Sequence, residues 1–353
     1  MPDSPPDPTV LDRARGLAAR LLDRLPGPVR VALSGRRPVR VDGATLDPTL
    51  QLAVALRQTK GRPERTRQQP VRSRAQFRRE VLSTVGTPTP VWGSRDLTVD
   101  GADGPLGARL YSPAGAASGR PPLLVYFHGG GYVEGDLDTA DEGCRVLCAE
   151  SGHAVLSVDY RLAPEHPFPA GPDDALAAFR WAQAETDRLG VSSVSVGGDS
   201  AGAALAATVA QAARDENPPA AQLLIYPPTD VPTDRPSRTL FDGFLLSDAQ
   251  RQAYHHTYTA GTGADDRDPR VSPLYGRLDG LAPALVVTAG FDVLRDEVDA
   301  YADALDRAGT RVEHLRFPHL THGFVNVTGM SRASRDALAR TARQWRDLVA
   351  STL

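Results

Sequence analysis

The feature that most constrains this 353-residue chain is a serine between glycines, at the junction of two contrasting segments. The apolar run 191–196 is typical of a β-strand, and the alanine-rich run 203–213 is typical of a helix. Between them, Gly198, Ser200 and Gly202 form the pattern G-x-S-x-G. Such glycines let a serine adopt a strained turn, with its hydroxyl exposed at the end of a sheet and beside a helix N-terminus. Ser200 is therefore a candidate nucleophile, although a plain glycine-rich turn would give the same short pattern.

Short apolar runs alternate with helical stretches through most of the chain. The expected strands are 123–127, 153–160, 191–196, 223–226, 284–288 and 311–317, preceded by an antiparallel edge at 95–99 and 108–111. Near-continuous apolar strands separated by helices predict a mostly parallel sheet that is covered by helices on both faces. The predicted fold class is therefore α/β.

Two stretches fall outside this alternation. Residues 1–90 predict helices at 10–25, from Asp47-Pro48 onward and at 70–85, with no strand before residue 95. Residues from about 229 to 280 are polar and rich in proline and aromatic side chains. We expect residues 1–90 to form a helical cap over a catalytic domain at 91–353, with a second cap contribution from about 229–280.

Composition narrows the choice of partners. A net charge of −3 gives no electrostatic reason to expect a nucleic-acid or anionic-membrane partner, so the expected substrate is a small neutral molecule. No signal peptide or membrane span is recognisable after residues 1–8, and the expected location is the cytoplasm. Cys144 and Cys148 share one face of a predicted helix and are expected to be buried apolar groups. No zinc-ligand spacing occurs, so neither metal nor cofactor is predicted.

A second glycine-rich turn follows the predicted strand 123–127. There, His128 precedes Gly129, Gly130 and Gly131, and a backbone without side chains can approach a ligand and point several N–H groups at one atom. We predict an oxyanion hole formed by the amides of Gly130, Gly131 and Ala201. A phosphate-binding loop is the alternative, but the sequence has neither G-x-x-x-x-G-K-[ST] nor a strand-linked G-x-G-x-x-G.

Five short motifs follow one another between residues 127 and 324. They are H-G-G-G-Y at 128–132, Y-R-L-A-P-E-H-P-F-P-A at 160–170, G-D-S-A-G at 198–202, D-V-L-R-D-E at 292–297 and H-G-F at 322–324. In these motifs the chain resembles the hormone-sensitive-lipase-like branch of the α/β-hydrolases, whose members are mostly short-chain carboxylesterases. The resemblance implies the α/β-hydrolase fold and a serine esterase that needs no cofactor. Residues 1–90 are similar to the family only in being a variable helical cap, apart from a family-like Leu46-Asp47-Pro48.

The resemblance also implies the other two members of a catalytic triad. In this family an acid and then a histidine follow the serine along the chain, each on a loop after a strand. By similarity, Asp292 is the acid and His322 is the base. Asp296 and Glu297 are rivals for the acid, although they fall where the next helix begins; His319 is the rival for the base. We expect Asp199 and the 160–170 segment to be structural.

The leading functional hypothesis is hydrolysis of short- to medium-chain acyl esters through an acyl-enzyme intermediate on Ser200. An acyltransferase, which hands the acyl group to an amine or alcohol, or an amidase, which cleaves an amide, would use the same triad, because the pocket walls and not the triad choose the reaction partners. A third hypothesis is a non-catalytic ligand receptor on this fold, similar to the gibberellin receptors, which lack a working histidine. The presence of His322 argues against this last possibility.

Overall fold

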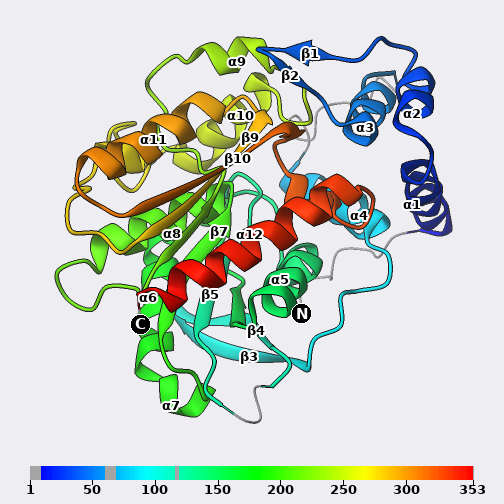
Figure 1. The fold of residues 1–353 in the computed structure, drawn as a ribbon. Coiled ribbons are helices and arrows are strands. Elements are labelled where there is room, and N and C mark those ends of the chain that lie inside the picture. The colour runs from blue at the N-terminus through cyan, green and yellow to red at the C-terminus, as the bar shows by residue number, and fades with distance from the viewer. Residues whose placement is uncertain (1–8, 60–68, 116–118, 353) are drawn as a thin grey trace.

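The computed structural model describes residues 9–59, 69–115 and 119–352, so the predicted absence of a signal peptide at residues 1–8 concerns residues outside the described part. Eight strands form one sheet in the order β10-β9-β8-β7-β5-β6-β4-β3 (Figure 1). The strands are β3 (Gly93–Gly101), β4 (Gly104–Ser112), β5 (Leu123–Phe127), β6 (Ala154–Val158), β7 (Val194–Asp199), β8 (Gln222–Ile225), β9 (Ala284–Phe291) and β10 (Val312–Thr321). Strands β5 to β10 are parallel, and β3 and β4 form the antiparallel edge, which confirms the predicted topology.

Helices cover both faces of this sheet. On one face lie α5 (Leu137–Ser151) and α12 (Arg332–Ala350), which pack against each other; on the other lie α6 (Ala170–Ala184), α8 (Ala201–Ala212) and α11 (Arg295–Arg307) (Figure 1). The short α7 (Thr186–Leu189) follows α6 and ends at Gly190 in the left-handed conformation. These layers confirm the predicted α/β class.

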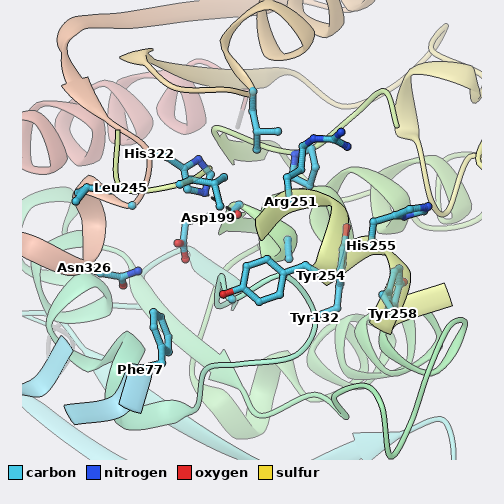
Figure 2. A pocket seen from close by; sticks show the side chains of 18 of the residues that line it. Phe77, Tyr132, Asp199, Leu245, Arg251, Tyr254, His255, Tyr258, His322 and Asn326 are labelled. Carbon is cyan, nitrogen blue, oxygen red and sulfur yellow. Dashed lines mark hydrogen bonds between the residues drawn. The ribbon is translucent and has the colours of Figure 1, made fainter. Parts of the chain in front are cut away.

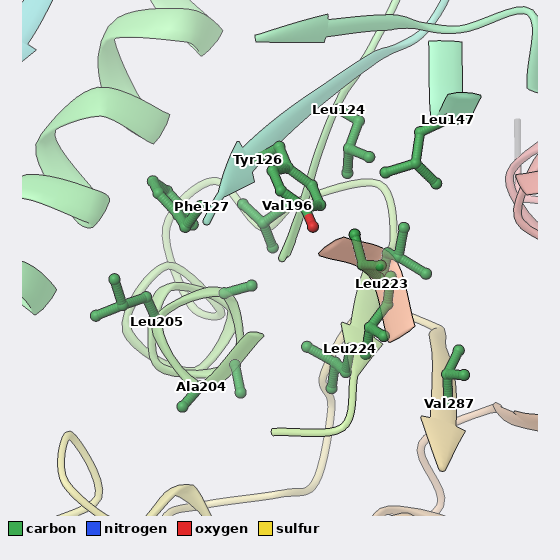
Figure 3. Close-up of a cluster of buried hydrophobic side chains, with 14 of the residues drawn as sticks. Leu124, Tyr126, Phe127, Leu147, Val196, Ala204, Leu205, Leu223, Leu224 and Val287 are labelled. Carbon is green, nitrogen blue, oxygen red and sulfur yellow. The ribbon is translucent and has the colours of Figure 1, made fainter. Parts of the chain in front are cut away.

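The core lies between the sheet and these helices. Every residue of β5, β6, β7 and β8 is buried, which explains why their sequences are almost continuously apolar. Figure 3 shows Leu124 beside Leu147 of α5 on one side of the strands, whereas Leu205 of α8 lies on the other side. Each such aliphatic side chain contributes about 1.5–3 kcal/mol when it is fully buried. Cys144 and Cys148 on α5 are buried in this core, as predicted.

The N-terminal region contains helices α1 (Val10–Asp23), α2 (Gly27–Leu33), α3 (Pro48–Thr59) and α4 (Pro70–Thr84). The predicted start of α3 is confirmed, since Asp47 accepts hydrogen bonds from the amides of Thr49 and Leu50 as a helix cap does. The expectation of no strand before residue 95 was wrong. Strands β1 (Arg40–Val41) and β2 (Ala44–Thr45) form a hairpin whose two loop residues, Asp42 and Gly43, both have positive φ, the arrangement of a type I′ turn.

The stretch between β8 and β9 adds α9 (Pro236–Leu240), α10 (Asp248–Thr259) and the 3₁₀ helix η3 (Pro273–Tyr275). A further 3₁₀ helix, η4 (Phe324–Val327), follows β10. Among the described residues, no helix combines the length and the apolar character needed to cross a membrane.

Candidate active site

Ser200 lies in a strained turn between β7 and α8. Its φ of 53° and ψ of −124° are unusual for a residue with a side chain, and its N–H donates to the carbonyl of Ile225 at 2.8 Å. The flanking glycines are required by space: a β-carbon would lie 2.4 Å from the Phe127 carbonyl oxygen at Gly198 and 1.9 Å from it at Gly202. The sequence pattern therefore corresponds to a sharp turn packed against the end of β5.

A continuous chain of hydrogen bonds starts at the Ser200 hydroxyl. The Nε2 atom of His322 lies 2.9 Å from Ser200 Oγ, and its Nδ1 atom lies 2.8 Å from Asp292 Oδ2. Asp292 is only 1% exposed, and its other oxygen accepts the N–H of Leu294 at 2.9 Å, which fixes the carboxylate plane. The structure thus brings together the three residues that the sequence singled out, from the ends of β7, β9 and β10.

The rival residues point elsewhere. Asp296 accepts the N–H of Ser237 at 2.8 Å, and Glu297 accepts from Arg238 at 3.0 Å, so both carboxylates hold the segment between β8 and β9. His319 sits within β10, and burial lowers the pKa of its imidazole. Within the described part of the chain, none of Asp296, Glu297 and His319 hydrogen-bonds to Ser200.

The glycine loop after β5 faces the serine. Gly130 and Gly131 have φ values of 129° and 62°, and both line the same pocket as Ser200 and Ala201. The amide of Gly129 is already used, because it donates to Asp199 Oδ1 at 2.9 Å. Gly130 and Gly131 therefore present backbone to the pocket while Gly129 anchors the loop.

Two groups predicted to be structural brace this loop. Asp199 Oδ1 also accepts the Tyr126 hydroxyl at 2.7 Å, and burial raises the pKa of the Asp199 carboxyl. From the 160–170 segment, the Tyr160 hydroxyl donates to the carbonyl of His128 at 2.8 Å, and the two rings stack with centroids 4.5 Å apart. The amide of Ala163 donates to the carbonyl of Tyr132 at 2.9 Å.

A pocket of about 260 Å³ opens above the serine (Figure 2). Its walls come from the loops after the parallel strands, from helix α4 and Arg57 of α3, and from the segment between β8 and β9. The mostly apolar wall residues from the last two parts include Phe77, Val81, Thr84, Val231, Leu245, Leu246, Tyr254, Tyr258 and Val271. Sequence reasoning did not identify these residues individually; the only available signal was the helical spacing of Phe77 and Val81.

No metal centre is visible in the described ranges, where no group of three or more His, Cys, Asp or Glu side chains is placed to hold an ion. The two cysteines lie in the core, and His322 is hydrogen-bonded to Asp292. The described site is therefore made of a serine, an imidazole, a carboxylate and backbone amides.

A family model identifies the class of protein to which the chain belongs. Residues 124–326 match a family model described as the alpha/beta hydrolase fold, which covers more than half of the chain. The chain belongs to the α/β-hydrolase family, in its hormone-sensitive-lipase-like branch.

Individual relatives are similar over most of their length. The chain is 42% identical to carboxylic ester hydrolase LipN of Mycobacterium tuberculosis over 322 residues, which cover 88% of this chain and 85% of LipN. It is 38% identical to the ethyl acetate hydrolase of Pseudomonas putida, covering 69% and 79% of the two chains. Among solved structures, ester hydrolase EH1AB1 from the Lake Arreo metagenome superposes with a TM-score of 0.82 at 38% identity, covering 87% of this chain and 99% of that one.

Proposed function

We propose that this carboxylic ester hydrolase cleaves short- to medium-chain acyl esters through an acyl-enzyme intermediate on Ser200. His322 Nε2 accepts the hydroxyl proton as Ser200 Oγ attacks the ester carbonyl, and Asp292 holds the imidazole by accepting from Nδ1. The amides of Gly130, Gly131 and Ala201 stabilise the oxyanion. His322 then donates its proton to the leaving alcohol, and water, activated by the same imidazole, releases the acid. The carrying observation is the unbroken hydrogen-bond chain from Ser200 through His322 to Asp292.

We further propose that residues 1–90 and about 229–280 act as the cap of this enzyme, over a catalytic domain at 91–353. Support comes from the pocket walls, since Phe77 and Val81 of α4 and Leu245 and Tyr254 of the second segment line the same cavity as Ser200. A covered pocket of about 260 Å³ limits the size of the acid or alcohol that it holds. We expect acyl chains of roughly two to eight carbons to be preferred over long-chain triglycerides.

Water is the proposed acyl acceptor. The relatives reported above are named hydrolases. An acyltransferase would need a pocket that favours an alcohol or amine over water as the acceptor, and an amidase would need one that fits an amide substrate. A ligand receptor is disfavoured by His322, which lies within hydrogen-bonding distance of Ser200. The net charge of −3 supports small neutral esters as substrates, and we propose that the enzyme acts on them in the cytoplasm.

The test is a panel of p-nitrophenyl esters of increasing acyl length, assayed with the parent protein and with two serine variants. Ser200→Ala should lower kcat by about a million-fold while the protein stays folded, because triad residues act as a unit. Ser195→Ala, on the same strand β7, is the matched control and should change kcat by less than about twofold. Turnover by Ser200→Ala at the parent rate would refute the proposed nucleophile.

A further inference from the structure

Glu134 is a fully buried carboxylate on the loop that carries Gly130 and Gly131. It has no place in the hydrogen-bond chain from Ser200 to Asp292. Burying a carboxylate costs free energy unless the carboxylate accepts hydrogen bonds. The hydrogen-bond partners of Glu134 therefore indicate its role.

Both oxygens of Glu134 accept hydrogen bonds from the two cap segments. Ser73 Oγ, on α4, donates to Glu134 Oε1, and the Tyr254 hydroxyl, on α10, donates to Oε2 at 2.8 Å. These donors are 61 and 120 residues away from Glu134 in sequence. One side chain thus joins the N-terminal helices and the segment between β8 and β9 to the glycine loop.

The backbone of Glu134 fixes the loop itself. Its N–H donates to the Gly130 carbonyl at 2.9 Å, and the N–H of Val133 donates to the same oxygen at 3.1 Å. A β-carbon at Gly130 would lie only 2.0 Å from the Glu134 carbonyl oxygen, so these two backbone segments are in direct contact. Any shift of Glu134 therefore moves the peptide planes of Gly130.

Tyr254 contacts the loop a second time through its ring. A β-carbon at Gly131 would lie 2.3 Å from Tyr254 Cγ, so the ring covers the α-carbon of Gly131. Figure 2 shows Tyr254 in the same pocket as His322 and Phe77. The hydroxyl of Tyr254 is tied to Glu134 while its ring limits where Gly131 can move.

We propose that Glu134 is a positioning residue for the oxyanion hole: it couples the docking of both cap segments, through Ser73 and Tyr254, to the orientation of the Gly130 and Gly131 amides. The inference rests on the proposed function, since it assumes that these amides receive the oxyanion. Stabilisation of a developing oxyanion depends on donors held at about 2.7–3.1 Å, so small rotations of these peptides reduce it. The effect is on the transition state and not on substrate binding.

Three variants test the coupling. Ser73→Ala is the cleanest, because Ser73 is buried outside the substrate pocket, so its loss changes no wall residue. Tyr254→Phe keeps the ring on Gly131 and removes only the hydroxyl, and Glu134→Gln keeps one acceptor oxygen. Tyr275→Phe is the matched control, since its hydroxyl donates to Asp230 at 2.8 Å in the same inserted segment but away from the glycine loop.

The measurements are kcat and KM for p-nitrophenyl butyrate, the inhibition constant of a trifluoromethyl ketone that mimics the tetrahedral intermediate, and the melting temperature. Ser73→Ala and Tyr254→Phe should each lower kcat by about tenfold and change KM by less than about twofold. Each should also raise the inhibition constant of the ketone by the factor by which it lowers kcat/KM. The kcat and the inhibition constant of Glu134→Gln should lie between those of these two variants and those of the parent. Tyr275→Phe should leave all three kinetic values at the parent level.

A lower melting temperature with unchanged kcat and unchanged ketone affinity in Ser73→Ala and Tyr254→Phe would overturn the proposal, because it would make the Glu134 contacts purely structural. Failure of the proposed function gives a different result: the parent protein itself would not be labelled on Ser200 by a serine-directed phosphonate. Labelling at Ser200 together with full activity of the variants therefore refutes the coupling alone.

Discussion

His322 and His319 lie three residues apart, but only His322 reaches Ser200. A general base must be within hydrogen-bonding distance of the proton that it accepts, and the 2.9 Å separation satisfies this for His322. We predict that His322→Ala lowers kcat by about a million-fold, as the serine change does, whereas His319→Ala lowers it by less than about tenfold. Steady-state kinetics of the two variants test this assignment, and equal losses would contradict it.

Asp199 offers a prediction about pH. Burial raises the pKa of its carboxyl above the ordinary value of 3.8. Since the folded-state pKa is raised, Asp199 stabilises the fold most when protonated, and this contribution is lost as the pH rises through the folded-state value. The hydrogen bonds from Tyr126 and Gly129 both reach Oδ1, which an asparagine retains.

Asp199→Asn should therefore gain stability relative to the parent protein as the pH rises. Between about pH 4 and pH 8, the melting temperature of the variant minus that of the parent should increase by about 2 °C or more. Differential scanning fluorimetry across this range measures the difference. A constant or decreasing difference would mean that Asp199 ionises in the folded protein as readily as in the unfolded chain.

At the scale of elements, helix α4 places Phe77 in the pocket and leaves Val71 72% exposed on the same helix. Phe77→Ala should enlarge the pocket and raise kcat/KM for an eight-carbon ester relative to a four-carbon ester by about tenfold. The change should be seen in either the acyl-chain or the alcohol-chain series. Val71→Ala is the control on the same helix and should leave the kcat/KM ratio unchanged in both series. An unchanged ratio in Phe77→Ala would show that α4 does not select the substrate.

Elements were predictable where periodicity and turn chemistry agree. The parallel strands are examples. Because the carboxyl ends of such strands meet at one edge of the sheet, the sequence also predicts that Ser200, Asp292 and His322 lie close together. Helix α2 was not among the predicted helices, although Pro28 lies in its first turn, where proline is favoured. Ser73, Glu134 and Tyr254 were not predictable as a group, since tertiary packing and not local pattern brings them together.

At the scale of the whole molecule, the N-terminal region contacts the rest of the chain at several distant points. Asp23 of α1 accepts from Arg332 of α12 at 3.2 Å, Asp42 of the hairpin accepts from Arg295 at 2.8 Å, and the amide of Asp47 donates to a carbonyl of β10 at 2.9 Å. Helix α4 also covers the pocket with Phe77. These contacts favour an integral cap over a detachable module.

Deletion of residues 1–85 tests whether the N-terminal region is an integral cap or a detachable module. We predict that the shortened protein exposes the apolar surface now covered by α4, and therefore aggregates or loses its selectivity for acyl chain length. Size-exclusion chromatography and the ester panel provide the measurements. A soluble, monodisperse enzyme with the chain-length profile of the full protein would show that the region is a separate module.

The most direct test of the account is the identification of the residue that carries the covalent intermediate. The protein should be incubated with a serine-directed alkyl phosphonate, digested, and analysed by mass spectrometry, with Asp292→Asn and His322→Ala treated in parallel. We predict a single adduct on Ser200 in the parent protein and labelling slower by about a thousand-fold or more in both variants, because the phosphonate needs the activated hydroxyl. An adduct on another residue with Ser200 unmodified, or equal labelling rates in all three proteins, would contradict the proposed mechanism.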